Sequence, residues 1–227
     1  MFSLRPRFVF SLLFLFIFLF ATPVVQAVPA DLAGHWVEDS VKDLIAQGIL
    51  NGYPDGTFRP DQSITRAELA KTLAVAYGLK EAAHQGQFPD TKGHWAEDYI
   101  AALAEAKIIT GYPDGSFKPE APVTRAEMVV MLTRLLKIGA DEEHYTIEFI
   151  PTFSDVAGDY WAFYQIEMAA KLGLLPKYYG PAFNPGRLAS RADTAWMLQQ
   201  SLNLKTVRGQ LISEPEAGTN LITVRPE

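Results

Sequence analysis

The chain has 227 residues, of which 48% are hydrophobic and 20% charged, and its formal net charge is −6. This composition is typical of an ordered globular protein and excludes an intrinsically disordered chain. The acidic balance argues against nucleic-acid binding, and the lack of cysteine excludes disulfides and thiolate metal sites.

The first 27 residues have the pattern of a secretory signal peptide. Two arginines come first, an apolar stretch runs from Phe8 to Phe20, and a small-residue cleavage pattern ends at Ala27. The alternative is an uncleaved membrane anchor, but the apolar stretch is shorter than the roughly 20 residues that a spanning helix needs. We therefore expect residues 1–27 to be removed and the mature protein to have no membrane contact.

Landmark residues recur three times at fixed spacing, counted from Trp36, Trp95 and Trp161. A Tyr follows each Trp by 17 residues, a Phe by 22, a Pro by 24, and a Thr or Ser, itself followed by Arg, by 29. Such repetition in register indicates a repeated structural unit. The expected divisions are repeat 1 (31–79), repeat 2 (88–138), repeat 3 (153–204) and a polar tail (205–227), which we expect to be a short strand around 220–224 or a flexible end.

Each repeat is predicted to form a helix, a loop and a second helix, which gives an all-α fold. In repeat 1, Val37, Val41 and Leu44 recur at helical spacing, and a turn rich in Gly, Pro and Asp follows. The second helix is predicted to begin at a Thr-Arg-Ala-Glu capping box in repeats 1 and 2. Repeat 3 has Ser-Arg-Ala-Asp instead. Because Asp is shorter than Glu, the pattern does not decide whether the acid also bonds back to the Ser amide.

Arg66, Arg125 and Arg191 occupy the first position of these second helices. A helix N-terminus carries unpaired amides and the positive end of the dipole, so an Arg there adds to a positive potential and favours an anion site. Its guanidinium suits two-point contact with a carboxylate or phosphate. The alternative is that each Arg pairs with a neighbouring acid, such as Asp39 or Asp61, and serves packing; three arginines at one position favour the anion site.

The recurring aromatic and imidazole side chains allow a structural and a functional interpretation. Trp36, Trp95 and Trp161 start amphipathic helices, which favours a place in the core over partial exposure in a groove, where an indole could stack on a sugar. His35 and His94 precede two of them and are expected to be local hydrogen-bonding groups, because no other residues have metal-ligand spacing.

Glu68, Glu127 and Asp193 recur in register, and their expected capping role accounts for them. No other carboxylates form an acid/base pair, and no Ser/His/Asp set recurs. We therefore expect a binding protein that is not an enzyme and that has no catalytic residue, metal or cofactor.

Repeat 2 resembles an S-layer homology (SLH) repeat along its whole length, through Phe-x-Asp, Gly-His-Trp, Gly-Tyr-Pro-Asp-Gly-x-Phe-x-Pro and Thr-Arg-Ala-Glu. Repeat 1 matches equally well, and repeat 3 matches at Phe-Ser-Asp-Val, Trp161, Phe-x-Pro and Ser-Arg-Ala-Asp. The resemblance implies one pseudo-threefold, all-helical domain. It also implies that grooves between repeats bind secondary cell wall polysaccharide, often pyruvylated, and hold exported proteins on the bacterial envelope.

The resemblance further implies that the Arg of Thr-Arg-Ala-Glu contacts the acidic sugar, helped by the Trp and the Gly-Tyr-Pro-Asp-Gly loop. The candidate glycan-binding residues are Arg66, Arg125, Arg191, Trp36, Trp95, Asp55, Asp114, Gly52 and Gly111. Repeat 3 has Lys-Tyr-Tyr-Gly-Pro in place of that loop. We expect repeat 3 to close the three-repeat core rather than to complete a working groove.

The leading hypothesis is a non-covalent anchor, secreted to the cell wall or surface of a bacterium, with secondary cell wall polysaccharide as its partner. The alternative keeps the SLH scaffold for protein–protein interaction or surface-layer assembly without glycan binding, with surface-layer proteins as partners. Neither hypothesis involves nucleic acid.

Overall fold

A computed structural model describes residues 28–79, 86–137 and 151–213. The signal peptide expected at 1–27 and the strand considered around 220–224 lie outside the described residues. Within them the chain forms six α-helices and no strand, so the all-α prediction is confirmed. The helices are α1 (Glu38–Ala46), α2 (Arg66–Tyr77), α3 (Glu97–Glu105), α4 (Arg125–Leu135), α5 (Phe163–Lys171) and α6 (Arg191–Ser213).

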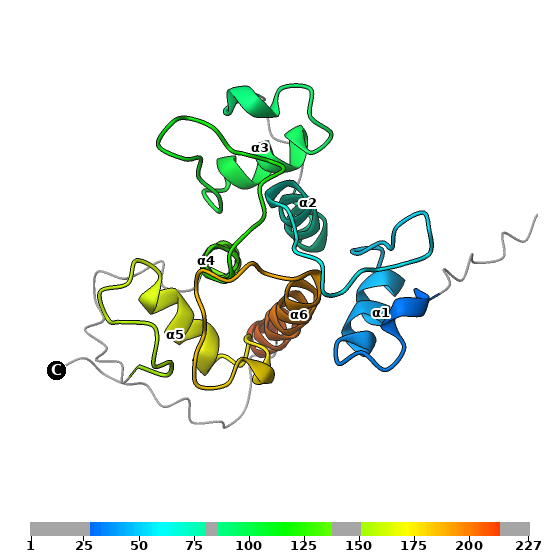
Figure 1. Cartoon of the computed structure of the whole chain (residues 1–227), viewed down its shortest axis with the longest axis vertical. Coiled ribbons are helices and arrows are strands. Elements are labelled where there is room, and N and C mark those ends of the chain that lie inside the picture. The colour runs from blue at the N-terminus through cyan, green and yellow to red at the C-terminus, as the bar shows by residue number, and fades with distance from the viewer. Residues whose placement is uncertain (1–27, 80–85, 138–150, 214–227) are drawn as a thin grey trace, which may run out of the picture.

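The helices are arranged around a pseudo-threefold axis. The second helices of the repeats, α2, α4 and α6, lie together at the centre, and α1, α3 and α5 surround them (Figure 1). Each outer helix packs on the inner helix of the neighbouring repeat: α3 on α2, α5 on α4, and α1 on α6. The repeats therefore interlock in a ring that closes after three.

The inner helices meet in a tightly packed apolar core. The space left between them has a volume of about 10 Å³, no more than the roughly 10–15 Å³ that a cavity needs to hold one water molecule. Its lining residues are Leu69, Leu73, Met128, Leu132, Thr194, Met197 and Leu198. Packing of this density makes the axis of the domain a rigid support for the loops at the start of each inner helix.

Three backbone hydrogen bonds join the repeats in a closed ring just before the inner helices. The Ile64 amide donates to the Ala189 carbonyl (3.0 Å), the Ala189 amide to the Val123 carbonyl (2.8 Å), and the Val123 amide to the Ile64 carbonyl (3.0 Å). The three residues are at most 1% exposed. Water therefore cannot replace a lost partner, and each repeat depends on the other two.

The inner helices begin where the capping boxes predicted. Thr65 with Glu68 and Thr124 with Glu127 form reciprocal boxes at the starts of α2 and α4. At the start of α6 the Asp193 amide donates to the Ser190 hydroxyl (2.9 Å), and the Ser190 amide donates to the Asp193 carboxylate (2.9 Å). The shorter acid of repeat 3 thus also closes its box.

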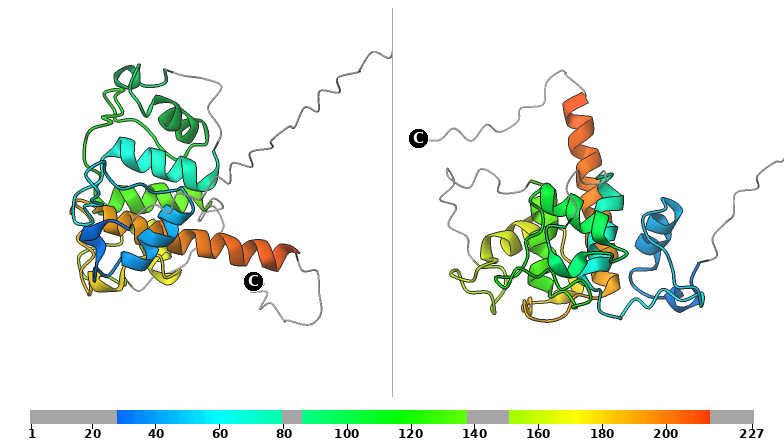
Figure 2. Two further views of the ribbon diagram at one scale, coloured as in Figure 1. Left: turned by 90° about the vertical axis from the view of Figure 1, so that its right-hand side faces the viewer. Right: turned by 90° about the horizontal axis from the view of Figure 1, so that it is seen from above.

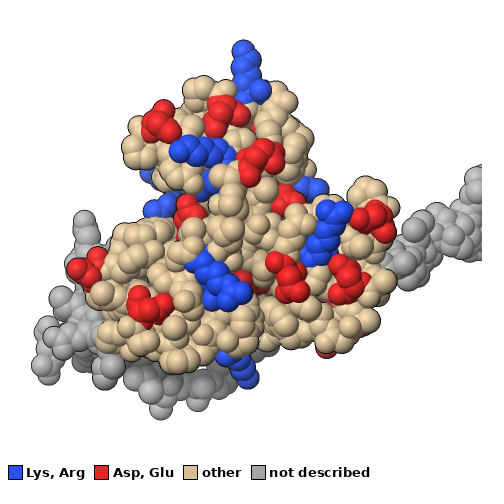
Figure 3. Space-filling view, in the orientation of Figure 1, with Lys and Arg blue, Asp and Glu red and all other residues tan. Residues whose placement is uncertain are grey.

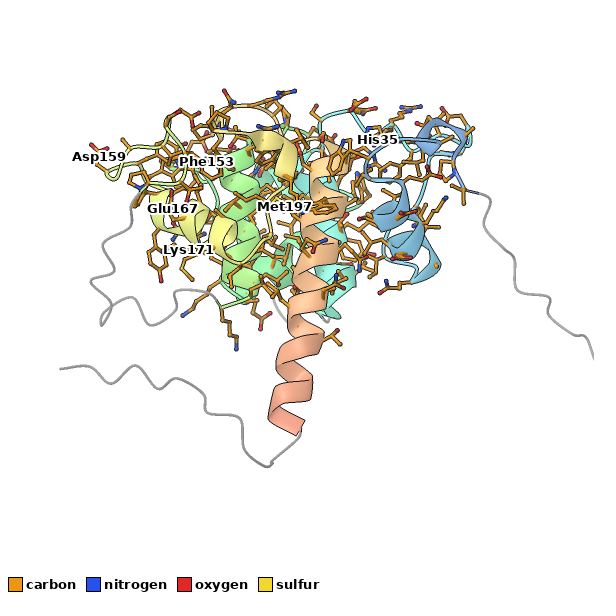
Figure 4. The ribbon with its side chains drawn as sticks, turned by 90° about the horizontal axis from the view of Figure 1, so that it is seen from below. His35, Phe153, Asp159, Glu167, Lys171 and Met197 are labelled. Atoms are coloured by element: carbon orange, nitrogen blue, oxygen red, sulfur yellow. The ribbon has the colours of Figure 1, made fainter. Side chains whose placement is uncertain are left out.

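α6 is the longest inner helix, and it continues past residue 204, where we expected repeat 3 to end. Its last turns extend beyond the bundle on the side away from the loops (Figures 2 and 4). The first part of the expected polar tail is therefore helical. None of the helices in the described residues has the length and apolar character needed to cross a bilayer.

An aspartate near the start of each repeat holds its loop. Asp90 accepts hydrogen bonds from the successive amides of Phe117 (2.9 Å) and Lys118 (2.7 Å), and Asp31 and Asp155 do the same in the other repeats. Lys118 has a φ of +57°, a left-handed conformation that costs energy in a residue other than Gly. Partial burial would raise the pKa of Asp90, but the backbone amides outweigh it and the pKa lies below its ordinary value.

We expect Asp90→Ala to lower the free energy of unfolding by about 1–2 kcal/mol, because two amides lose a charged acceptor. A folded-state pKa below the unfolded value adds stability that is present above about pH 4 and is lost as the pH falls through the folded-state pKa. Urea unfolding should therefore show a gap between the two proteins that shrinks from about pH 7 to about pH 2.5. The exposed Asp159→Ala is the control and should cost less than about 0.5 kcal/mol; an equal gap at both pH values would contradict the clamp.

Candidate functional site

A groove that draws on all three repeats runs along α2. We call it groove A; it is lined by the loop 49–53 of repeat 1, by Arg191 of repeat 3 and by Trp95 of repeat 2. Glu68 and Lys71 of α2 form its helical wall. The volume of groove A is about 200 Å³.

The equivalent space along α4 is groove B. It is lined by the loop 108–113 of repeat 2, by Arg66 of repeat 1 and by Trp161 of repeat 3, with Glu127 and Arg134 on its helical wall. Its volume is about 210 Å³, close to that of groove A. Each groove therefore takes its arginine from one neighbouring repeat and its indole from the other.

In groove B the Arg66 side chain is buried against repeat 2 and is only 4% exposed. Nε donates to the Phe117 carbonyl (2.7 Å) and Nη2 to the Thr110 carbonyl (3.2 Å), while Nη1 lies 3.7 Å from the Glu127 carboxylate. The guanidinium also lies over the Phe117 ring, with Cζ 4.4 Å from the ring centroid. Arg66 therefore fastens repeat 1 to repeat 2.

Arg191 makes the same contacts in groove A. Nε donates to the Phe58 carbonyl (2.8 Å) and Nη2 to the Asn51 carbonyl (3.3 Å), and Nη1 lies 3.6 Å from the Glu68 carboxylate. Packing thus accounts for much of what these arginines do, as the alternative interpretation held. Their partners are loop carbonyls and a capping glutamate of the next repeat, rather than Asp39 or Asp61.

The amides at the starts of the inner helices already have partners. The Arg66 amide donates to the Ala121 carbonyl (2.9 Å) and the Ala67 amide to the Pro119 carbonyl (2.9 Å), both in the loop of the next repeat. The Glu68 amide donates to the Thr65 hydroxyl. These amides are therefore not free to bind an anion, so any anion site must rest on the charged side chains of the grooves.

The third equivalent position, groove C along α6, is filled by aromatic rings. Trp36 lies against Tyr178, with ring centroids 5.0 Å apart, and against Trp196 at 5.9 Å. Arg125 is 2% exposed and donates from Nη1 to the Phe183 carbonyl (3.0 Å). A wider hollow of about 640 Å³ remains at its mouth, lined in part by Trp36 and Tyr178. Groove C therefore differs in shape and chemistry from grooves A and B.

The repeated tryptophans are not core residues, contrary to our expectation. Trp36, Trp95 and Trp161 are 45%, 55% and 59% exposed. The small residues that follow them in sequence, such as Ala96, fill the core position instead, and Ala96 is fully buried. The indoles of Trp95 and Trp161 are therefore available as flat apolar walls of grooves A and B.

Gly52 and Gly111 line grooves A and B, and close packing accounts for the lack of a side chain. A Cβ on Gly111 would lie 2.5 Å from Phe88 Cε1 and 2.9 Å from the Ser116 carbonyl oxygen. A Cβ on Gly52 would lie 3.0 Å from the Thr57 carbonyl oxygen. A side chain at either position would push the loop away from the groove floor.

Asp55 and Asp114 lie on the turns of the loops and are not among the residues that line the grooves. Asp114 accepts hydrogen bonds from the Ser116 hydroxyl (2.6 Å) and amide (3.0 Å) and lies 3.2 Å from Lys118 Nζ. The Ser116 hydroxyl and amide lower the pKa of Asp114 to about 2. Asp55 makes the equivalent bonds to Thr57. Both carboxylates thus stabilise a turn.

Among the groove residues that the sequence did not single out as ligand contacts are Trp161, Lys71 and Arg134. Trp161 stands in register with Trp36 and Trp95, so the spacing could have identified it as a groove wall. Lys71 and Arg134 occupy positions that are not equivalent in their repeats, and no recurring pattern marks them.

The histidines are local hydrogen-bonding groups, as predicted. Nδ1 of His35 accepts from the Val37 amide (3.3 Å), and Nδ1 of His94 accepts from the Ala96 amide (3.1 Å). Across residues 28–79, 86–137 and 151–213, no group of His, Asp and Glu could hold a metal ion.

The comparisons with known proteins agree with the internal repeats. The family model for the S-layer homology domain matches residues 30–70, 87–129 and 152–195, more than half of the chain. The chain is 40% identical over 140 residues to a cellulosome-anchoring protein of Acetivibrio thermocellus, which covers 58% of the chain and 30% of that protein.

Two relatives from Bacillus anthracis match over a longer stretch of 171 residues. S-layer protein EA1 is 32% identical, over 75% of this chain and 19% of its own length. An uncharacterized cell wall amidase is 34% identical, over 74% of this chain and 30% of its own length. The chain thus spans less than a third of each of these curated relatives.

We expect Arg66→Ala to lower the free energy of unfolding by about 3 kcal/mol. The substitution leaves two loop carbonyls without a donor and the Glu127 carboxylate without its cation. Arg59→Ala is the control, because Arg59 is exposed and contacts Asp55, Thr57 and Tyr53 of its own loop, so its loss should cost clearly less than the loss of Arg66. If urea unfolding gave similar values for both variants, Arg66 would not be a fastener between repeats.

Proposed function

Because this chain belongs to the S-layer homology domain family, we propose that it anchors to the bacterial cell envelope by binding an acidic secondary cell wall polysaccharide. Grooves A and B are the proposed binding sites. The sugar rings stack on Trp95 and Trp161, and the acidic groups, such as pyruvate ketals, are held by the cations of the grooves.

One observation carries this proposal: each of the two grooves pairs an exposed indole with an excess of positive charge. Arg191 and Lys71 face one carboxylate in groove A, and Arg66 and Arg134 face one carboxylate in groove B. The chain as a whole carries a formal net charge of −6. Local cation excess in an acidic protein favours an anionic ligand at these two places.

Repeat 3 contributes to both proposed sites although its own loop is degenerate. It supplies Arg191 to groove A and Trp161 to groove B. Groove C lacks an open space of the same form, because Trp36, Tyr178 and Trp196 lie against one another. We assign it no part in binding the acidic glycan.

The surface charge favours a discrete ligand over nucleic acid. On the face seen in Figure 3, acidic and basic side chains are interspersed and form no continuous basic patch. Non-specific nucleic-acid binding depends on such a patch. A wall polysaccharide with acidic groups at intervals suits separate cationic grooves better.

We propose that the chain binds the wall and does not hydrolyse it. Glu68 and Glu127 are the groove carboxylates, and both are engaged in capping boxes and beside an arginine. Neither stands opposite a second carboxylate that could act as acid or base in glycoside hydrolysis. The amidase among the relatives is matched over only 30% of its length.

The proposed place of action is the cell wall or surface, reached by secretion. Two features support it: the signal-peptide pattern of residues 1–27 and relatives named for the S-layer and for anchoring. The competing function is protein–protein interaction or surface-layer assembly on the same scaffold, and wall binding separates the two.

The test is co-sedimentation of the purified protein with sacculi of the source organism, intact or stripped of secondary polysaccharide by acid. We expect binding to intact sacculi only. Trp95→Ala and Trp161→Ala should each weaken it by about tenfold, because each groove loses a stacking wall. Trp36→Ala is the matched control and should bind as the wild type does. Equal binding to intact and stripped sacculi would instead favour a protein partner.

A further inference from the structure

The buried arginines of grooves A and B have few donors left for a ligand. In Arg66 and Arg191, Nε and Nη2 donate to loop carbonyls and Nη1 faces a carboxylate at 3.6–3.7 Å. Their side chains are only 4% and 10% exposed. Each can therefore offer an incoming anion one edge of its guanidinium at most.

Each groove also contains a cation without an intramolecular partner. Lys71 lines groove A and Arg134 lines groove B. Among the described residues, neither the Lys71 ammonium nor the Arg134 guanidinium has a hydrogen bond or an ion pair. Arg134 is exposed and Lys71 is half-buried, so each can pair with an anion that enters the groove.

The two free cations are not at equivalent positions. In the alignment of the capping boxes, Lys71 corresponds to Val130, and Arg134 corresponds to Val75. The two positions lie four residues apart on an inner helix, which is about one turn or roughly 5–6 Å along the axis. The same two positions of α6, in groove C, hold Trp196 and Gln200, so neither position carries a cation, and the nearest lining cation of the wider hollow is Arg187 from the preceding loop.

We propose that Lys71 and Arg134 are the specificity-determining cations of grooves A and B, and that they hold the ligand's acidic group at two different depths. The acidic group of the ligand contacts α2 near the start of that helix in groove A, and it contacts α4 one turn further along the helix in groove B. Arg134 can grip a carboxylate at two points, whereas Lys71 offers a point charge. Groove B therefore selects more strongly for a planar carboxylate.

This inference rests on the proposed glycan binding, and its test separates the two. The probe is secondary polysaccharide released from sacculi with hydrofluoric acid and cut to short fragments, titrated calorimetrically into the purified protein. The same fragments with their carboxyl groups chemically reduced serve as the uncharged probe. We expect two sites for the acidic fragments in the wild-type protein and weak binding of the reduced ones.

Lys71→Ala and Arg134→Ala should each weaken one of the two sites by about tenfold, and the double variant should weaken both. Lys92→Ala is the matched control, because it removes one exposed positive charge outside the grooves and should leave both sites intact. Neither cation has a partner within the part of the chain that the structure describes, so urea unfolding of the variants should match the wild type.

A double variant that binds acidic fragments as tightly as the wild type would overturn the role of Lys71 and Arg134 while glycan anchoring stands. If the wild-type protein bound neither the acidic nor the reduced fragments, the proposed function itself would fail, and this inference with it. Loss of both sites in either single variant would refute the assignment of one cation to each groove.

Discussion

The structure depends on backbone donors of one repeat finding acceptors in the next. The amides of Ile64, Val123 and Ala189 form a closed ring of hydrogen bonds, and the first amides of each inner helix donate to the neighbouring loop. A repeat on its own would expose or orphan these groups, at a cost comparable to several lost hydrogen bonds. The apolar core adds the larger share of the stabilisation, but the ring determines that the number of repeats is three and that their order is cyclic.

The same dependence creates the grooves. The arginine side chain of one repeat hydrogen-bonds to the carbonyls of the next loop, and its guanidinium forms part of the floor of a groove. The outer helix of the following repeat then brings an indole to the far wall, as Trp95 does for groove A. Binding surface and repeat interface are therefore built from the same contacts. This explains how repeat 3 can lose its own loop motif and still serve both open grooves through Arg191 and Trp161.

Much of the fold follows from local signals in the sequence. The capping boxes fix where the inner helices begin, the register of landmarks fixes the number of repeats, and both agree with the structure. The candidate site was harder to predict from the sequence. The direction in which the ring closes decides which arginine contacts which loop, and the spacing of the landmark residues does not carry this information. The degenerate loop of repeat 3 indicated that this repeat completes no working groove, yet the two open grooves contain Arg66 and Arg191, and Arg191 belongs to repeat 3. The exposure of the tryptophans was not predicted. The alanine or valine after each tryptophan takes the core position, so the tryptophan itself stays outside the core.

The length of α6 makes the two ends of the domain different. Its 23 residues correspond to a rod of about 35 Å, which starts at the loops and ends beyond the opposite side of the bundle (Figure 2). The end of α6 at Ser213 therefore lies on the opposite side of the bundle from the loops that line grooves A and B. A helix of this kind acts as a spacer: when the loop side faces a surface, α6 points away from that surface, and the length of the helix sets how far Ser213 stands from it.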